Sequence, residues 1–242
     1  MRIVVTPRDA MQGKKTFIPT KTKAEYINML LKVGFDTVDF GSFVSPKAVP
    51  QMSDTAEVLK MLDLSQTKSK LLAIVGNLKG AQIGSAYDQI NYFGYPFSTS
   101  ATFLKLNINS TIDGALETIS EIQNICIKSN KEKELVIYFS MAFGNPYDDE
   151  HNDEIVIKGI EKLQKIGIKT ISLADTLGVG DNTVIANSFR QIKNEFPDIQ
   201  LGLHLHVSME EAADKVDAAY KAGCRYFDTA MLGMGGCPMS AH

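Results

Sequence analysis

The hexapeptide IGIKTI, residues 166–171, ends a helical stretch and begins a strand within six residues. Lys165 precedes it and Gly167 lies within it, as is typical of a helix C-terminus, where glycine forms the left-handed cap and a cation faces the negative end of the helix dipole. The same order recurs in VGFDTV, residues 33–38, and AGCRYF, residues 222–227. The chain is therefore predicted to repeat one helix-then-strand unit.

Short apolar runs alternate with longer stretches of helical spacing along the chain, a pattern typical of βαβ units around a parallel sheet. The predicted strands are RIVVT (2–6), DTVDFG (36–41), KLLAIVG (70–76), INYFGY (90–95), ELVIYFS (134–140), KTISLAD (169–175), QLGLHLHV (200–207) and RYFDTAM (225–231). The clearest predicted helices span residues 22–34, 111–130, 153–167 and 208–223. Eight strands in this alternation predict an α/β fold, a closed TIM (β/α)8 barrel.

The composition sets the class of protein. With 242 residues, 44% hydrophobic and 22% charged, the chain is expected to form one barrel domain over residues 1–242. The formal net charge of −3 argues against nucleic acid as a partner. Neither a signal peptide nor a membrane-spanning run is recognisable, so no membrane partner is expected. Three widely spaced cysteines fit a reducing compartment, and we expect a cytoplasmic protein in which Cys126 and Cys224 pack in the core.

Chemistry-bearing residues follow several predicted strands, where the active site of a (β/α)8 barrel gathers. His204 and His206 alternate along one strand and therefore share a face, while Asp9 follows the first strand. One carboxylate and two imidazoles are a ligand set for a divalent cation, Mg²⁺ or Mn²⁺, with positions open to substrate. The alternative for the histidine pair alone is hydrogen bonding at the rim of the strand.

Two further residues suggest catalysis. Arg8, beside Asp9, could stabilise an oxyanion on a carbonyl or thioester oxygen, although a salt bridge at the strand end is the alternative. Cys237 lies in GMGGCPMS, residues 233–240, where glycines give mobility and a buried structural cysteine is unusual. We interpret Cys237 as a reactive thiol on a lid.

Five motifs together carry a resemblance over nearly the whole chain. SFVSPKAVPQM (42–52), NLKG (77–80), SLADTLGVG (172–180), the His-x-His of residues 204–206 and GGCP (235–238) occur in the order and context of the 3-hydroxy-3-methylglutaryl-CoA lyase family. The first and last are more specific than the histidine pair, which the wider family of metal-dependent Claisen-type barrel enzymes shares. The sequence therefore resembles this lyase family.

The resemblance implies cleavage of 3-hydroxy-3-methylglutaryl-CoA to acetoacetate and acetyl-CoA. It further implies that Asp9, His204 and His206 bind the cation, that Arg8 polarises the thioester carbonyl and that Cys237 donates a proton to the enolate.

Four other residues are candidates for binding the acyl-CoA substrate. Gln12 and Asp175 lie at strand ends as hydrogen-bonding groups, with holding a loop as the alternative for each. Lys47 and Lys79 are candidates for its phosphates or carboxylate, with simple solvation as the alternative.

The sequence departs from the family pattern near the expected site. Asp39, which we assign to the catalytic group, stands where the family usually has Glu, and its shorter side chain requires backbone adjustment to reach the same partners. Val4, Thr6, Val207 and Ser208 replace the family's usual residues in the first-strand and His-x-His motifs. A related Claisen or aldol enzyme for another hydroxy acid or acyl-CoA is therefore one alternative function.

The end of the sequence is a further departure. It stops at His242, before the SGN whose Asn is a metal ligand in the family and before the helix expected after the last strand. We therefore expect a C-terminally incomplete barrel without its last helix, whose outer strand faces are covered in a homo-oligomer. A barrel remnant that only binds acyl-CoA or a partner is the second alternative.

Overall fold

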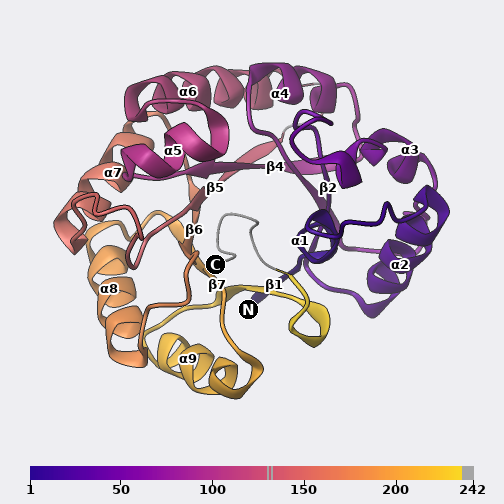
Figure 1. The fold of residues 1–242 in the computed structure, drawn as a ribbon. Helices are drawn as coiled ribbons and strands as arrows, with labels where there is room; N and C mark the ends of the chain where they lie inside the picture. The colour runs from indigo at the N-terminus through magenta and orange to yellow at the C-terminus, as the bar shows by residue number, and fades with distance from the viewer. Residues whose placement is uncertain (130, 132, 236–242) are drawn as a thin grey trace.

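A computed structural model describes residues 1–129, 131 and 133–235. All eight predicted strands form, and their parallel pairing in chain order closes a barrel (Figure 1). The strands are β1 (Arg2–Val5), β2 (Thr37–Ser42), β3 (Lys70–Ile74), β4 (Ile90–Phe97), β5 (Glu134–Phe139), β6 (Thr170–Asp175), β7 (Gln200–Leu205) and β8 (Tyr226–Thr229). The predicted (β/α)8 barrel is confirmed.

Helices alternate with the strands and surround the barrel (Figure 1). They are α1 (Pro7–Gln12), α2 (Thr20–Val33), α3 (Thr55–Lys60), α4 (Leu78–Ser85), α5 (Ala101–Ile108), α6 (Ile112–Lys128), α7 (Asp153–Lys165), α8 (Asn182–Glu195) and α9 (Met209–Lys221), with 3-10 turns η1 (Pro50–Met52) and η2 (Met231–Gly233). After β8, the part of the chain described to Gly235 holds η2 and no α-helix. No helix among the described residues is long and apolar enough to cross a membrane.

The helix ends obey the repeated punctuation of the sequence. Gly34, Gly167 and Gly223 adopt φ values of +86°, +91° and +103°, which side-chain-bearing residues rarely adopt. Each follows a helix and precedes a strand. The left-handed glycine is what lets each chain segment reverse from the outer layer back into the barrel wall.

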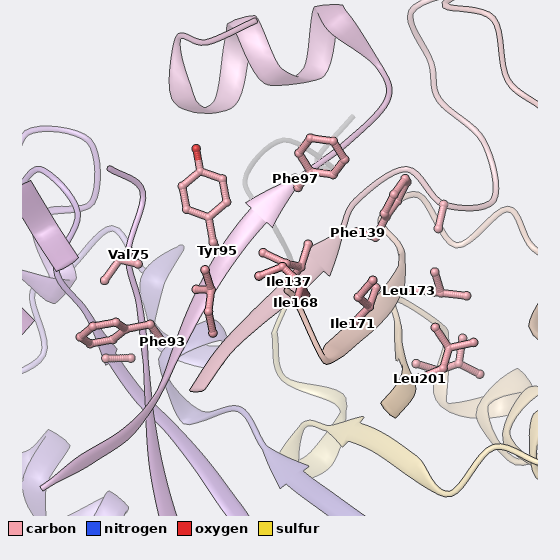
Figure 2. Close-up of a cluster of buried hydrophobic side chains, with 14 of the residues drawn as sticks. Val75, Phe93, Tyr95, Phe97, Ile137, Phe139, Ile168, Ile171, Leu173 and Leu201 are labelled. Atoms are coloured by element: carbon pink, nitrogen blue, oxygen red, sulfur yellow. The ribbon is translucent and has the colours of Figure 1, made fainter. Parts of the chain in front are cut away.

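The outward faces of the central strands form the main core. Alternate residues of β4, β5 and β6 point away from the barrel axis, as Figure 2 shows for Phe93, Tyr95 and Phe97, Ile137 and Phe139, and Ile171 and Leu173. These side chains are at most 1% exposed. The helices therefore pack on strands through one face of each strand, which leaves the alternate residues to fill the barrel interior. Cys126 and Cys224 are buried, as predicted, and burial raises the pKa of each thiol to about 12.

The interior is filled at the N-terminal ends of the strands. The Arg2 guanidinium lies over the rings of Tyr92 and Tyr226, 4.5 and 4.7 Å from their centroids. A Cβ at position 202 would stand 2.3 Å from the Tyr226 ring, so glycine there is what admits this tyrosine. With that end filled, the space for a site lies at the C-terminal ends.

Candidate metal centre and active site

His204 and His206 point to one spot at the C-terminal end of β7. Their Nε2 atoms lie 3.2 Å apart, and their ring centroids lie 5.1 Å apart. The alternation of residues along a strand produces this convergence, as the sequence predicts. The spacing resembles that of neighbouring ligands of one octahedral cation, ~3 Å when each bond is ~2.1 Å.

The other ring nitrogen of each histidine faces an acceptor. His204 Nδ1 lies 2.8 Å from Asp228 Oδ2, and His206 Nδ1 lies 2.9 Å from the carbonyl oxygen of Thr176. With a carboxylate and a carbonyl as partners, both Nδ1 atoms are assigned the proton, and both Nε2 lone pairs face the same space. Two lone pairs at this distance repel each other unless a proton or a metal ion lies between them. The pair can therefore share a proton or bind a cation.

The two histidines differ in electrostatic environment. Burial lowers the pKa of His204, but the hydrogen bond and charge of Asp228 outweigh it and the pKa is raised. Burial and the neighbouring His204 lower the pKa of His206.

Asp9 supplies the third candidate ligand from α1. One of its oxygens lies within 4.8 Å of the histidine ligand atoms, in a group that could hold a metal ion. Its Oδ1 accepts hydrogen bonds from Gln12 Nε2 at 2.6 Å and Arg8 Nη1 at 3.0 Å, which fixes the carboxylate. An oxygen and two imidazole nitrogens, with sides left open, fit Mg²⁺ or Mn²⁺.

Arg8 is held between two carboxylates. Its Nη2 and Nε donate to Asp39 Oδ2 at 2.7 and 3.0 Å, and its Nη1 donates to Asp9. These bonds take three of the five guanidinium N–H groups and leave two without an acceptor among the described residues. Burial lowers the pKa of Arg8, but the charges of Asp39 and Asp9 outweigh it and raise the pKa overall.

Asp39 is completely buried beneath this arginine. Burial raises the pKa of Asp39 to about 6, against the lowering effect of the Arg8 charge. The shorter carboxylate reaches Arg8 in spite of its length, and the pairing of β2 with β3 shifts register between Asp39 and Gly41. The register shift lies next to Asp39, and the backbone adjustment expected for the shorter aspartate stays a prediction.

A cavity of about 360 Å³ opens above these residues. Arg8, Asp9, Gln12 and both histidines line it on one side, and Val44, Val49, Phe103, Leu106 and Ile108 form apolar walls. The walls come from the segment after β2 and from α5. A second cavity of about 540 Å³ reaches the same histidines from between β7, β8 and α9.

Comparison with protein-family models identifies one match, which covers residues 2–238 and is described as HMGL-like. The chain belongs to the HMGL-like family. Curated members are similar over nearly its whole length. The mitochondrial hydroxymethylglutaryl-CoA lyase of Bos taurus is 33% identical over 98% of this chain and 71% of its own length. The cytoplasmic 3-hydroxy-3-methylglutaryl-CoA lyase of Rattus norvegicus is 31% identical over 98% of this chain and 68% of its own length.

A solved member of the HMGL-like family has the same architecture. The HMG-CoA lyase of Acinetobacter baumannii, in complex with coenzyme A and 3-methylmalate, matches with a TM-score of 0.89 and 30% identity. The match covers 99% of this chain and 77% of that one.

The HMGL-like barrel brings together some predicted site residues and separates others. Arg8, Asp9, Gln12, His204 and His206 share the cavity of about 360 Å³. Asp175 is not among its lining residues, and its carboxylate accepts the backbone N–H groups of Val179 and Gly180, so its contacts favour the loop-holding alternative. Lys47 and Lys79 are exposed and line neither cavity. Cys237 lies outside the described residues.

Two residues of the site escaped the sequence analysis. Asp228 binds His204 from inside β8, and Thr176 accepts from His206 through its backbone. The sequence offered a signal for Asp228, because this acidic residue directly follows the apolar Tyr226 and Phe227 of a predicted strand. A carboxylate in a strand core is rarely left unpaired, so a partner could have been expected. Thr176 left none, since any residue offers a carbonyl.

Proposed function

We propose that this chain is a divalent-metal-dependent carbon–carbon lyase that cleaves 3-hydroxy-3-methylglutaryl-CoA to acetoacetate and acetyl-CoA. The observation that carries the proposal is the convergence of Asp9, His204 and His206 beside Arg8 at the floor of one cavity. The relatives named as lyases of this substrate support it, as does the solved relative that holds coenzyme A.

Asp9, His204 and His206 would hold the cation. When bound, Mg²⁺ or Mn²⁺ would act as a Lewis acid toward substrate oxygens. Gln12 and Arg8 keep the Asp9 carboxylate in place through hydrogen bonds to Oδ1. Gln12 is thus proposed to act on the substrate site by orienting Asp9.

Arg8 would stabilise the negative charge that develops on the thioester oxygen as the carbon–carbon bond breaks. Its two remaining N–H groups are available for that oxygen, and its orientation is fixed before substrate arrives, which is the condition for effective oxyanion stabilisation. Asp39 holds the other edge of the guanidinium. We therefore propose Arg8 as the catalytic residue and Asp39 as the residue that positions it.

The role of Cys237 comes from the resemblance to the lyase family, whereas the roles of Lys47 and Lys79 rest on their positive charge. Cys237 is proposed to protonate the acetyl-CoA enolate, and Lys47 and Lys79 to meet the phosphates of the acyl-CoA from the exposed rim. A cytoplasmic location remains our prediction, which the name of the rat relative supports and that of the bovine relative does not.

The test is acetoacetate release from 3-hydroxy-3-methylglutaryl-CoA by the 242-residue chain with Mg²⁺ or Mn²⁺, and again after chelation. We expect release that depends on the cation. His204→Ala should abolish it, whereas Glu134→Gln, at the N-terminal end of β5, should not. Release that survives chelation would contradict the metal dependence. No release from a folded chain would contradict the proposed reaction and favour one of the two alternatives, another substrate or a barrel remnant that only binds.

A further inference from the structure

Asp228 is a buried carboxylate that meets His204 from the neighbouring strand. It lies on β8, its side chain is 2% exposed, and its Oδ2 is 2.8 Å from His204 Nδ1. Asp228 lies on the side of the histidine ring opposite Nε2, the atom that faces His206.

The surroundings of Asp228 offer it little else. Its nearest other partner is the Ser172 hydroxyl at 3.5 Å, and its Oδ1 has no hydrogen-bond partner among the described residues. A buried carboxylate with one oxygen unsatisfied costs free energy. This cost suggests that the hydrogen bond from Asp228 to His204 has a function.

His204 has few alternative ways to hold its ring. The ring edge of Tyr138 lies against it, with centroids 5.5 Å apart at 80°, and limits how the imidazole can tilt. This contact restricts the ring plane but does not decide which ring nitrogen carries the proton. The hydrogen bond to Asp228 favours the proton on Nδ1, because a carboxylate oxygen only accepts.

We propose that Asp228 is a positioning residue of the metal centre, which holds His204 as the Nδ1–H tautomer and presents its Nε2 lone pair to the cation. The inference rests on the metal site of the proposed function. A carboxylate behind a ligating imidazole fixes the ring orientation and raises the basicity of the ligand nitrogen. His206 obtains the same tautomer from a backbone carbonyl, so Asp228 is the side chain through which this geometry can be changed.

The experiment compares Asp228→Ala and Asp228→Asn with the unchanged chain and with Glu134→Gln as a matched control. Glu134 accepts a hydrogen bond from the Thr170 hydroxyl at the opposite end of the barrel, so its variant tests a carboxylate-to-amide change away from the histidines. Two readouts are used. The affinity for Mn²⁺ is measured by electron paramagnetic resonance, and the histidine tautomers of the metal-free chain are read from ¹⁵N NMR shifts.

The expected result is a loss of Mn²⁺ affinity of roughly 10- to 100-fold in D228A. A smaller loss is expected in D228N, because the amide oxygen still accepts from Nδ1. At a pH where both imidazoles are neutral, the His204 signal should change from the Nδ1–H tautomer to a mixture of tautomers in D228A, while E134Q matches the unchanged chain. Unchanged Mn²⁺ affinity and unchanged tautomers in D228A would overturn the proposal.

Two outcomes remain decisive if other parts fail. If D228A does not fold, D228N decides, and an affinity equal to that of E134Q would overturn the proposal. If the unchanged chain binds no Mn²⁺, the proposed metal centre is wrong. The tautomer readout needs no cation and still reports whether Asp228 sets the protonation of His204.

Discussion

Arg8 and Asp39 form a buried pair whose geometry leaves little tolerance for a different side chain. Two guanidinium N–H groups reach one carboxylate oxygen, and the carboxylate has no solvent exposure. Such a pair contributes mainly orientation, because its attraction is largely offset by the loss of hydration. The value of Asp39 to the protein therefore lies in where it places Arg8.

Asp39→Glu tests this adaptation. The added methylene would have to fit at a fully buried position, and overpacking costs typically ~1–3 kcal/mol. We expect a lower free energy of unfolding, measured by urea denaturation, together with a lower kcat for acetoacetate release. Asp39→Asn, of nearly the same shape, is the control for volume. Higher activity in D39E would mean that the short carboxylate limits the enzyme.

Cys237→Ser tests the thiol to which the resemblance to the lyase family assigns proton donation. We expect turnover to fall by at least about 100-fold, within the range that general acid catalysis contributes. Mn²⁺ affinity should stay unchanged, because sulfur is not among the proposed ligands. Turnover equal to that of the unchanged chain would remove Cys237 from the mechanism.

The helix α5 forms one wall of the cavity of about 360 Å³ and is held in place by the segment between β5 and α7. Asp149, from the segment between β5 and α7, accepts from the Ser100 hydroxyl at 2.5 Å and from the Thr102 backbone at 3.0 Å. These bonds lower the pKa of Asp149, with Ser100 as the largest cause. The helix that they secure carries Phe103, Leu106 and Ile108, which wall the cavity.

Asp149→Ala should therefore affect both stability and substrate binding. Losing a carboxylate at a helix N-terminus typically costs ~1 kcal/mol. KM should rise more than kcat falls, because the change loosens a wall and leaves the catalytic residues in place. The stabilisation by a carboxylate of lowered pKa is present above about pH 4 and is lost as the pH falls. The stability difference between the two chains, measured by thermal melting, should shrink accordingly. An unchanged KM would disconnect Asp149 from the cavity.

Across the whole molecule, the candidate metal centre brings together segments that are far apart in the sequence. Asp9 follows β1 and the histidines lie at the C-terminal end of β7, so a bound cation would link segments almost 200 residues apart. β7 pairs with β8 through one residue pair, Leu203 with Phe227, whereas β6 and β7 pair over six residues. A cation at this seam should stabilise the barrel's closure.

Mn²⁺ at 100 times its Kd should stabilise the folded chain by ~2.7 kcal/mol, since it binds the folded state preferentially. For a chain of this size that corresponds to a rise in Tm of roughly 5–10 °C. Differential scanning calorimetry with and without Mn²⁺ measures it. His204→Ala should show no rise. An equal rise in that variant would locate the binding elsewhere.

The barrel is also predicted to self-associate. Met209, Leu232 and Met234 lie close to the seam and are 66%, 78% and 41% exposed, an apolar surface that association would cover. The outer-face residues Val5 and Phe227 are already buried within the chain. We expect an oligomer by light scattering coupled to size-exclusion chromatography, and Leu232→Ser should weaken it. A monodisperse monomer would contradict this prediction.

Local sequence patterns were enough to predict the barrel and most of the candidate metal site. Strand periodicity, the glycine at each helix end and the alternation of His204 with His206 are local properties, which neighbouring residues dictate without reference to the rest of the chain. The residues that hold His204 and Arg8 in place became visible in the tertiary structure. Asp228 reaches His204, and Asp39 reaches Arg8, because strand pairing brings together segments that are far apart in the sequence. Those pairings depend on the strand register of the closed sheet, which no local sequence pattern predicts.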